Sequence, residues 1–164
     1  MQLLKTIEFE KVVPEELAEY PIQRTVRAVV FDGEGKIALL FASKKNYHTL
    51  PGGGIKEGEN VEEALRRECR EEIGCEIKIT GEVGRIIEHR IKQKKKKESL
   101  CYLTEVIGSK GEPSFTEREK ELEFSILWVS MDKAIEILEK EEPGNYQGKF
   151  ILDRELTFLR EVQK

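Results

Sequence analysis

The segment from Asn60 to Gly74 constrains this chain most, because it has the pattern of one amphipathic helix with both ends marked. Asn60 is a favourable N-cap, Glu63 stands three positions later as in a capping box, and Gly74 is a favourable stop. Between them, apolar residues recur every three or four positions. The pattern predicts a helix over Val61–Ile73 with one face against a core.

Three carboxylates interrupt that apolar pattern. On a helical wheel Glu68 and Glu72 fall inside the apolar band, and Glu71 lies just beyond its edge. Burying unpaired carboxylates is costly, whereas oxygen ligands at this spacing project together from one helical turn and suit a divalent cation. The alternative is that the glutamates form ion pairs with basic residues elsewhere, although Arg67 could neutralise only one of them.

A glycine run precedes the helix. Gly52, Gly53 and Gly54 follow Pro51, and three glycines permit positive φ angles and leave backbone groups free to approach a metal or a phosphate. With an acidic helix face a few residues later, the run predicts a site where Mg²⁺ and an anionic ligand meet.

The rest of the chain alternates strand and helix patterns. Apolar alternation and turn residues predict strands at 3–9, 25–31, 36–41, 77–91, 99–107 and 123–129, one helical turn in 15–20, and helices at 131–140 and 147–162. This order favours an α/β layered fold around a mixed sheet. No linker or repeat divides the 164 residues, so we expect a single domain, 1–164.

Composition excludes several classes of protein. Charged residues make up 37% and hydrophobic residues 38%, which fits a soluble globular protein, and the net charge of −4 lacks the basic surplus of a general nucleic-acid binder. No apolar run approaches a membrane span or a signal peptide, so we expect a cytoplasmic protein without a membrane partner. Cys69, Cys75 and Cys101 are odd in number and form no CxxC pair, so buried free thiols are expected.

The glycine run and the acidic helix together resemble the signature of the Nudix hydrolases, G-x5-E-x7-R-E-U-x-E-E-x-G-U, where U is a bulky aliphatic residue. Its specified glycine and charged positions are all filled: Gly53, Glu59, Arg67, Glu68, Glu71, Glu72 and Gly74. Cys69 and Cys75 stand where aliphatic residues are usual, and His48 stands where many members have tryptophan. The resemblance implies a Nudix fold, an α/β/α sandwich with a mixed β-sheet.

The resemblance also implies roles for the signature residues. Glu68 and Glu72 resemble the principal metal-ligating glutamates, Glu71 an additional ligand, and the carbonyl of Gly52 a backbone ligand. Mg²⁺ is the implied ion, and Mn²⁺ could substitute for it.

Glu59 and Arg67 resemble residues that fix the loop and orient the glutamates. The implied reaction is hydrolysis of the diphosphate linkage in a nucleoside diphosphate-X compound, such as a nucleoside triphosphate or an oxidised nucleotide. Because the metal carries most of this chemistry, we expect in-line attack by metal-activated water, two or more ions and no covalent intermediate.

The general base is left open by the sequence. In this family it is often a glutamate on the loop before a late strand, which Trp128 marks here. Spacing favours Glu121 or Glu123, and Glu71 is the competing candidate.

Substrate contacts are the least specific expectations. Arg24 and Arg27 could clamp phosphate or lie on an ordinary exposed strand face, and Tyr47 and His48 could contact substrate or merely pack in a loop. The run from Lys92 to Lys97 reads as the tip of a hairpin, either a solvated loop or an attractor of a phosphate-rich substrate.

A small nucleotide-like diphosphate is therefore the expected partner, and capped RNA stays open, as does the choice between monomer and homodimer. Two rivals belong to other classes. One is a catalytically inactive Nudix module that senses nucleotides, and the other is a metal-stabilised interaction protein.

Overall fold

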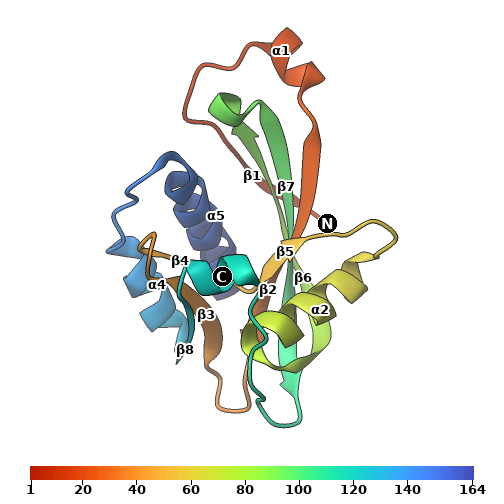
Figure 1. The fold of residues 1–164 in the computed structure, drawn as a ribbon, viewed down its shortest axis with the longest axis vertical. Helices are drawn as coiled ribbons and strands as arrows, with labels where there is room; N and C mark the ends of the chain where they lie inside the picture. Colours follow the sequence, from red (N-terminus) through yellow and green to blue (C-terminus); the bar gives the residue numbers. More distant parts are fainter.

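A mixed eight-stranded sheet forms the framework of the computed structural model, which describes all 164 residues (Figure 1). The strands are β1 (Leu3–Ile7), β2 (Ile22–Phe31), β3 (Ile37–Ala42), β4 (Tyr47–Thr49), β5 (Gly52–Gly54), β6 (Glu76–Arg90), β7 (Lys95–Ile107) and β8 (Phe124–Val129). The helices are α1 (Pro14–Glu19), α2 (Val61–Ile73), α3 (Glu117–Glu121), α4 (Met131–Glu139) and α5 (Tyr146–Gln163), with a 3-10 turn, η1, at Ile91–Gln93. No helix combines the length and apolarity needed to cross a bilayer.

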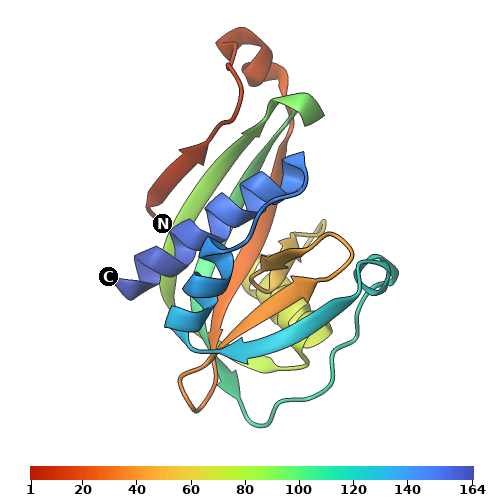
Figure 2. The ribbon, with the colours of Figure 1, turned by 90° about the vertical axis from the view of Figure 1, so that its left-hand side faces the viewer.

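The strands run in the order β1-β6-β7-β2-β3-β4, while β5 pairs with β2 and β8 pairs with β3. The β1–β6 and β2–β7 pairs are parallel, and the other pairs are antiparallel. Figure 2 shows that β2, β6 and β7 are the long strands and extend past α5 towards α1. The mixed sheet expected from the sequence is therefore confirmed.

Two apolar cores lie on opposite faces of the sheet, because side chains alternate along each strand. On β2, Val26, Ala28 and Val30 join the core beneath α2, whereas Val29 joins the core beneath α4 and α5. Figure 1 shows α2 on one side of the sheet and α4 and α5 on the other. The α/β/α sandwich is thus confirmed, and the three cysteines are buried free thiols as expected.

The capping signals of α2 operate as predicted. The Asn60 side chain accepts a hydrogen bond from the Glu63 amide, the Glu63 carboxylate accepts one from the Asn60 amide, and Gly74 ends the helix in the left-handed conformation. This fixed start sets which face of α2 meets the sheet, and that face carries both apolar residues and carboxylates.

A buried ion network joins the second face of the sheet to α5. Arg154 donates hydrogen bonds to Glu88 on β6 at 3.1 Å and to Glu155 at 2.6 Å, and all three side chains are fully buried. Arg90, also buried, donates to the second oxygen of Glu88 at 2.6 Å. Burial alone would lower the pKa of Arg154, but Glu155 and Glu88 reverse that effect, so its pKa is raised.

The structure corrects one expectation about the segments around the sheet and adds one helix that the sequence analysis did not predict. The second hairpin turns at η1 and Lys94, so Lys95, Lys96 and Lys97 belong to β7 and do not form a loop tip. The helix α3 was not expected at all. It begins at a capping box in which Thr116 and Glu119 exchange hydrogen bonds, a pattern that the T-x-x-E spacing carries.

The network predicts unequal effects for two arginines of α5. Replacing Arg154 with methionine leaves the buried carboxylate of Glu155 without its cation and Glu88 with Arg90 alone, and should lower the free energy of unfolding by about 3–5 kcal/mol. Arg160→Met is the matched control, because Arg160 forms only an exposed pair with Glu139, worth less than about 1 kcal/mol. Urea unfolding measures both, and equal effects would contradict this role for the network.

Candidate active site

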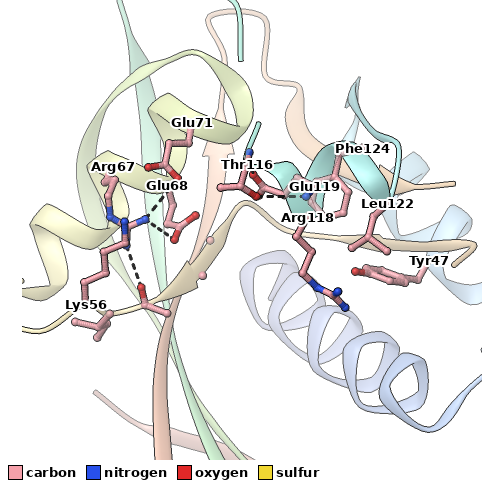
Figure 3. A pocket seen from close by; sticks show the side chains of 14 residues that line it. Tyr47, Lys56, Arg67, Glu68, Glu71, Thr116, Arg118, Glu119, Leu122 and Phe124 are labelled. Atoms are coloured by element: carbon pink, nitrogen blue, oxygen red, sulfur yellow. Dashed lines mark hydrogen bonds and ion pairs between the residues drawn. The ribbon is translucent and has the colours of Figure 1, made fainter. Parts of the chain in front are cut away.

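A cavity of about 560 Å³ opens between α2 and the segment that carries α3, a size within the range of small-molecule sites. Its walls meet across the strand β5 (Figure 3). One side carries Lys56, Arg67, Glu68 and Glu71, and the other carries Tyr47, Thr116, Arg118, Glu119, Leu122 and Phe124. The acidic face of α2 thus faces a wall of mixed aromatic and charged side chains.

The glycine run forms β5, which pairs with β2 and lines the cavity with all three residues. Gly52 has φ of +145°, and a Cβ there would overlap the carbonyl oxygen of Val26. A Cβ on Gly53 would overlap the carboxylate of Glu68. The first glycine is therefore required by the strand pairing, and the second gives Glu68 room beside the backbone.

Arg67 organises the carboxylates of the α2 side. It donates to Glu59 at 2.6 Å and 3.0 Å, to Glu68 at 2.7 Å and to the carbonyl of Gly54 at 3.0 Å, while Glu71 lies 3.6 Å away. The hydrogen bond from Arg67 lowers the pKa of Glu59 to about 2. Glu59 does not line the cavity, so it holds Arg67 in place, the arrangement that the resemblance implied for this pair.

Glu72 has a different environment from its neighbours. Its side chain is buried, it accepts a hydrogen bond from the Gly52 amide at 3.0 Å, and no lysine or arginine pairs with it. Burial raises the pKa of Glu72 well above its usual value, and the nearby charge of Glu68 raises it further. The fold thus keeps a buried acid that forms no ion pair, and the nearby charge of Arg27 offsets only part of the effect of burial.

These residues fit a divalent cation, although no three acidic, histidine or cysteine side chains converge on one point in the structure. Arg67 pairs with both Glu68 and Glu71, so the alternative of ion pairing holds for these two residues, but Glu72 forms no ion pair. The Gly52 carbonyl, expected as a ligand, accepts a hydrogen bond from Arg27 at 2.6 Å. A cation here would draw on hard oxygen donors, with Glu72 the carboxylate that gains most from it.

A second, smaller cavity of about 120 Å³ adjoins the first and shares Tyr47, Gly52, Glu119 and Phe124 with it. Its other lining residues include three cations and one carboxylate, namely Arg27, Lys97, Arg154 and Glu72. We call this cavity the cationic pocket. Burial lowers the pKa of Lys97 well below its usual value, and the charges of Arg154 and Arg27 lower it further.

The structure corrects the expectation for the acidic run before β8. Glu121 is exposed and lines neither cavity, and Glu123 turns away to accept a hydrogen bond from Ser43 at 2.8 Å and to pair with Lys44 at 3.4 Å. Glu119 instead lines both cavities. The α3 turn decides this outcome, because it points one glutamate of the run inward and leaves its neighbours outside.

The expected substrate contacts divide in the same way. Arg27 and Tyr47 line the cationic pocket, whereas Arg24 is exposed, pairs with Glu98 at 3.0 Å and lines neither cavity. His48 also lies outside the cavities, where it stacks on Phe41 and its ring accepts or donates a hydrogen bond with Glu141 at 2.9 Å. His48 therefore packs against its neighbours and does not line a cavity, and Arg24 lies on an exposed face of its strand.

Several residues of these walls were not singled out by the sequence reasoning, among them Glu119, Arg154 and, beyond its membership of the lysine run, Lys97. The capping-box spacing at Thr116 could have placed Glu119 on a helix. Lys97 had no distinguishing mark within a run of lysines, and Arg154 enters from α5 by tertiary packing alone. Local sequence patterns do not predict contacts between residues that are far apart in the chain.

Comparison with known proteins agrees with this geometry. A family model described as NUDIX domain matches residues 21–150, which is more than half of the chain. The nucleoside triphosphatase NudI of Enterobacter sp. (strain 638) is 41% identical over 63 residues, covering 35% of this chain and 45% of that protein. NudI of Escherichia coli O139:H28 is 58% identical over 31 residues, covering 19% and 22%. The chain thus spans less than half the length of these relatives.

Solved structures share the fold. The MutT protein from Methanosarcina mazei Go1 superposes with a TM-score of 0.60 at 24% identity, covering 89% of this chain and 99% of that chain. A NUDIX hydrolase from Nitrosomonas europaea gives 0.63 at 15% identity, covering 87% and 88%. The extent of the family match and the shared architecture together establish that the chain belongs to the Nudix family.

Proposed function

We propose that this chain is a Mg²⁺-dependent hydrolase that cleaves the diphosphate linkage of a nucleotide-like substrate with water. The observation that carries the proposal is Glu72, a buried carboxylate that forms no ion pair and lines the smaller of two adjoining cavities, next to the wall that carries Glu68 and Glu71. Fold stability alone gives no reason to keep it, because an apolar side chain in the same place would avoid the desolvation penalty.

A divalent ion bound to Glu68, Glu71 and Glu72 would neutralise charge on the diphosphate and lower the pKa of a bound water. The residues around it have supporting duties. Arg67 and Glu59 hold the loop and the glutamates in position. The backbone of β5 would lie close to the substrate, because its glycines lack side chains. Positioning and charge stabilisation, the main demands of phosphoryl transfer, are thus met by neighbouring elements.

Glu119 is our candidate for the residue that accepts the proton of the attacking water. It lines both cavities opposite the α2 glutamates, and one of its carboxylate oxygens is fixed by the Thr116 amide at 2.8 Å. Glu71 also lines the larger cavity and stays the competing base. Glu121 and Glu123 are set aside because their side chains lie outside the cavities.

The aromatic wall supports a nucleoside-sized partner for the larger cavity. Tyr47 and Phe124 line it together with Arg118, and a purine or pyrimidine ring can stack on such side chains. This wall favours a nucleotide over inorganic diphosphate. The inactive sensing module remains the second candidate, because the same walls would bind a nucleotide without hydrolysing it.

Glu72→Gln tests the enzyme proposal. The change should lower kcat at least about 100-fold on the nucleotide that the parent hydrolyses fastest in a panel of nucleoside triphosphates, oxidised nucleotides, dinucleoside polyphosphates and capped RNA. The melting temperature of the metal-free protein should stay level or rise, since Gln mimics the neutral acid. Glu62→Gln, on the exposed face of α2, is the matched control and should retain full activity. No hydrolysis across the panel by the parent would favour the sensing module.

Magnesium affinity should rise with pH. Because burial raises the pKa of Glu72, the folded protein holds a proton that the unfolded chain has already lost above about pH 4.5, so ionising Glu72 destabilises the metal-free fold as pH rises. Ion binding needs the ionised form and therefore displaces the proton. Calorimetry at pH 6 in buffers of different ionisation enthalpy should detect proton release on Mg²⁺ binding, and Glu72→Gln should abolish it. Binding without proton release would place the ion elsewhere.

The base assignment is tested by three matched substitutions in one acidic run. Glu119→Gln should lower kcat about 10²–10⁴-fold and remove the acidic limb of the pH–rate profile, because general-base catalysis is lost. Glu121→Gln and Glu123→Gln should keep both the rate and the profile. If Glu71→Gln alone removes the acidic limb, the base is Glu71.

A further inference from the structure

The cationic pocket holds more positive charge than the reaction proposed above uses. Arg27 and Arg154 are buried side chains that line it, and Lys97 lines it from β7. Arg27 donates hydrogen bonds to the backbone carbonyls of Gly52 and Leu50. Lys97 forms no ion pair with a carboxylate. The Nε atoms of Arg27 and Arg154 are buried without a hydrogen-bond partner.

The carboxylates behind this pocket do not balance its cations. Arg154 bridges Glu88 and Glu155, and Arg90 shares Glu88. The buried carboxylates of this network are thus hydrogen-bonded to Arg90 and Arg154. Glu72 and Glu119 line the pocket as well, but neither Arg27 nor Lys97 forms an ion pair with a carboxylate. Holding Arg27 and Lys97 in their charged forms is unfavourable here, because burial and the charge of Arg154 lower the pKa of each.

The size and position of the pocket restrict the anion that fits. Its volume of about 120 Å³ is several times the roughly 30 Å³ that one liquid water occupies, so it has room for a group of a few heavy atoms and not for a sugar with its base. It adjoins the larger cavity at Gly52 and Glu119, and Glu72 lies on its border. A group in this pocket is therefore next to the carboxylates at which the diphosphate would be cleaved.

We infer that the cationic pocket binds the terminal, unesterified phosphate of a nucleoside 5′-polyphosphate, with Arg27, Lys97 and Arg154 as its cationic walls. The nucleoside then lies in the larger cavity against Tyr47 and Phe124, and the chain of phosphates crosses between the two. This inference rests on the proposed hydrolase function and narrows its substrate class. Compounds whose diphosphate is esterified at both ends, such as a dinucleoside polyphosphate, would have to place a second bulky group where the walls leave no room.

Lys97→Met is the test variant. It removes a charge that has no carboxylate partner, so it leaves no buried group unpaired, and the melting temperature should stay level or rise. Lys96→Met, one residue earlier on β7 and outside both cavities, is the matched control. Lys97→Arg retains the charge and should retain the binding preference. Arg154 is unsuitable for this test because its loss disrupts the ion network.

Binding is measured by calorimetry in the presence of Mg²⁺ with two probes. One is a nucleoside triphosphate whose two bridging oxygens are replaced by methylene groups, and the other is the same compound with its terminal phosphate esterified by methanol. The parent should bind the free phosphate at least about 10-fold more tightly than the ester, since a hydrogen bond between charged groups contributes roughly 10- to 100-fold. Lys97→Met should lose this preference by weakening only the free probe, and Lys96→Met should keep it.

Equal binding of the two probes by the parent would overturn the inference, as would equal weakening of both by Lys97→Met. Either result leaves the proposed hydrolase intact, because turnover of the nucleotide panel tests that separately. Conversely, a protein that shows the preference and hydrolyses no nucleotide would support the pocket and contradict the enzyme.

Discussion

The burial of carboxylates on the apolar face of α2 is the constraint on which the rest of this structure depends. Glu68 and Glu72 occupy helical positions that pack against the sheet, so their charges must be met by whatever the sheet presents there. The sheet presents the glycine strand β5, in which the Gly52 amide donates a hydrogen bond to Glu72 and Gly53 leaves room for Glu68, while Arg67 of α2 itself pairs with Glu68. The carboxylate charge that no side chain pairs with makes this end of the molecule a candidate for ion binding.

A second charge imbalance of opposite sign lies next to the first. The wall formed by β2, β7 and α5 carries the cations, while α2 carries the carboxylates, and Gly52 lines both cavities. Each wall is unfavourable by itself, because desolvation penalises both kinds of charge. Together they form a site that suits a metal on one side and an anion on the other, so the two ligands would favour each other's binding.

Much of this arrangement was predictable from local sequence. The caps at Asn60 and Gly74, the periodicity of α2 and the alternation of the strands all act within a few residues, and the structure confirms each of them. The cationic pocket was not predictable, because Arg27, Lys97 and Arg154 come together only through the β2–β7 pairing and the docking of α5. The identity of the inward-facing glutamate depended on one short turn, α3, whose capping signal is brief enough to be overlooked.

Gly52 and Gly53, two of the three glycines of β5, differ in what their loss would indicate about a relative without activity. Gly52 is dictated by the close approach of β2, so any chain that keeps this strand pairing must keep it whether or not it has activity. Gly53 is dictated only by the space that the Glu68 carboxylate occupies. A descendant that abandoned ion binding and shortened Glu68 would be free to acquire a side chain at position 53. A relative that keeps Gly52 but has lost Gly53 would therefore be expected to keep the fold and to have lost ion binding.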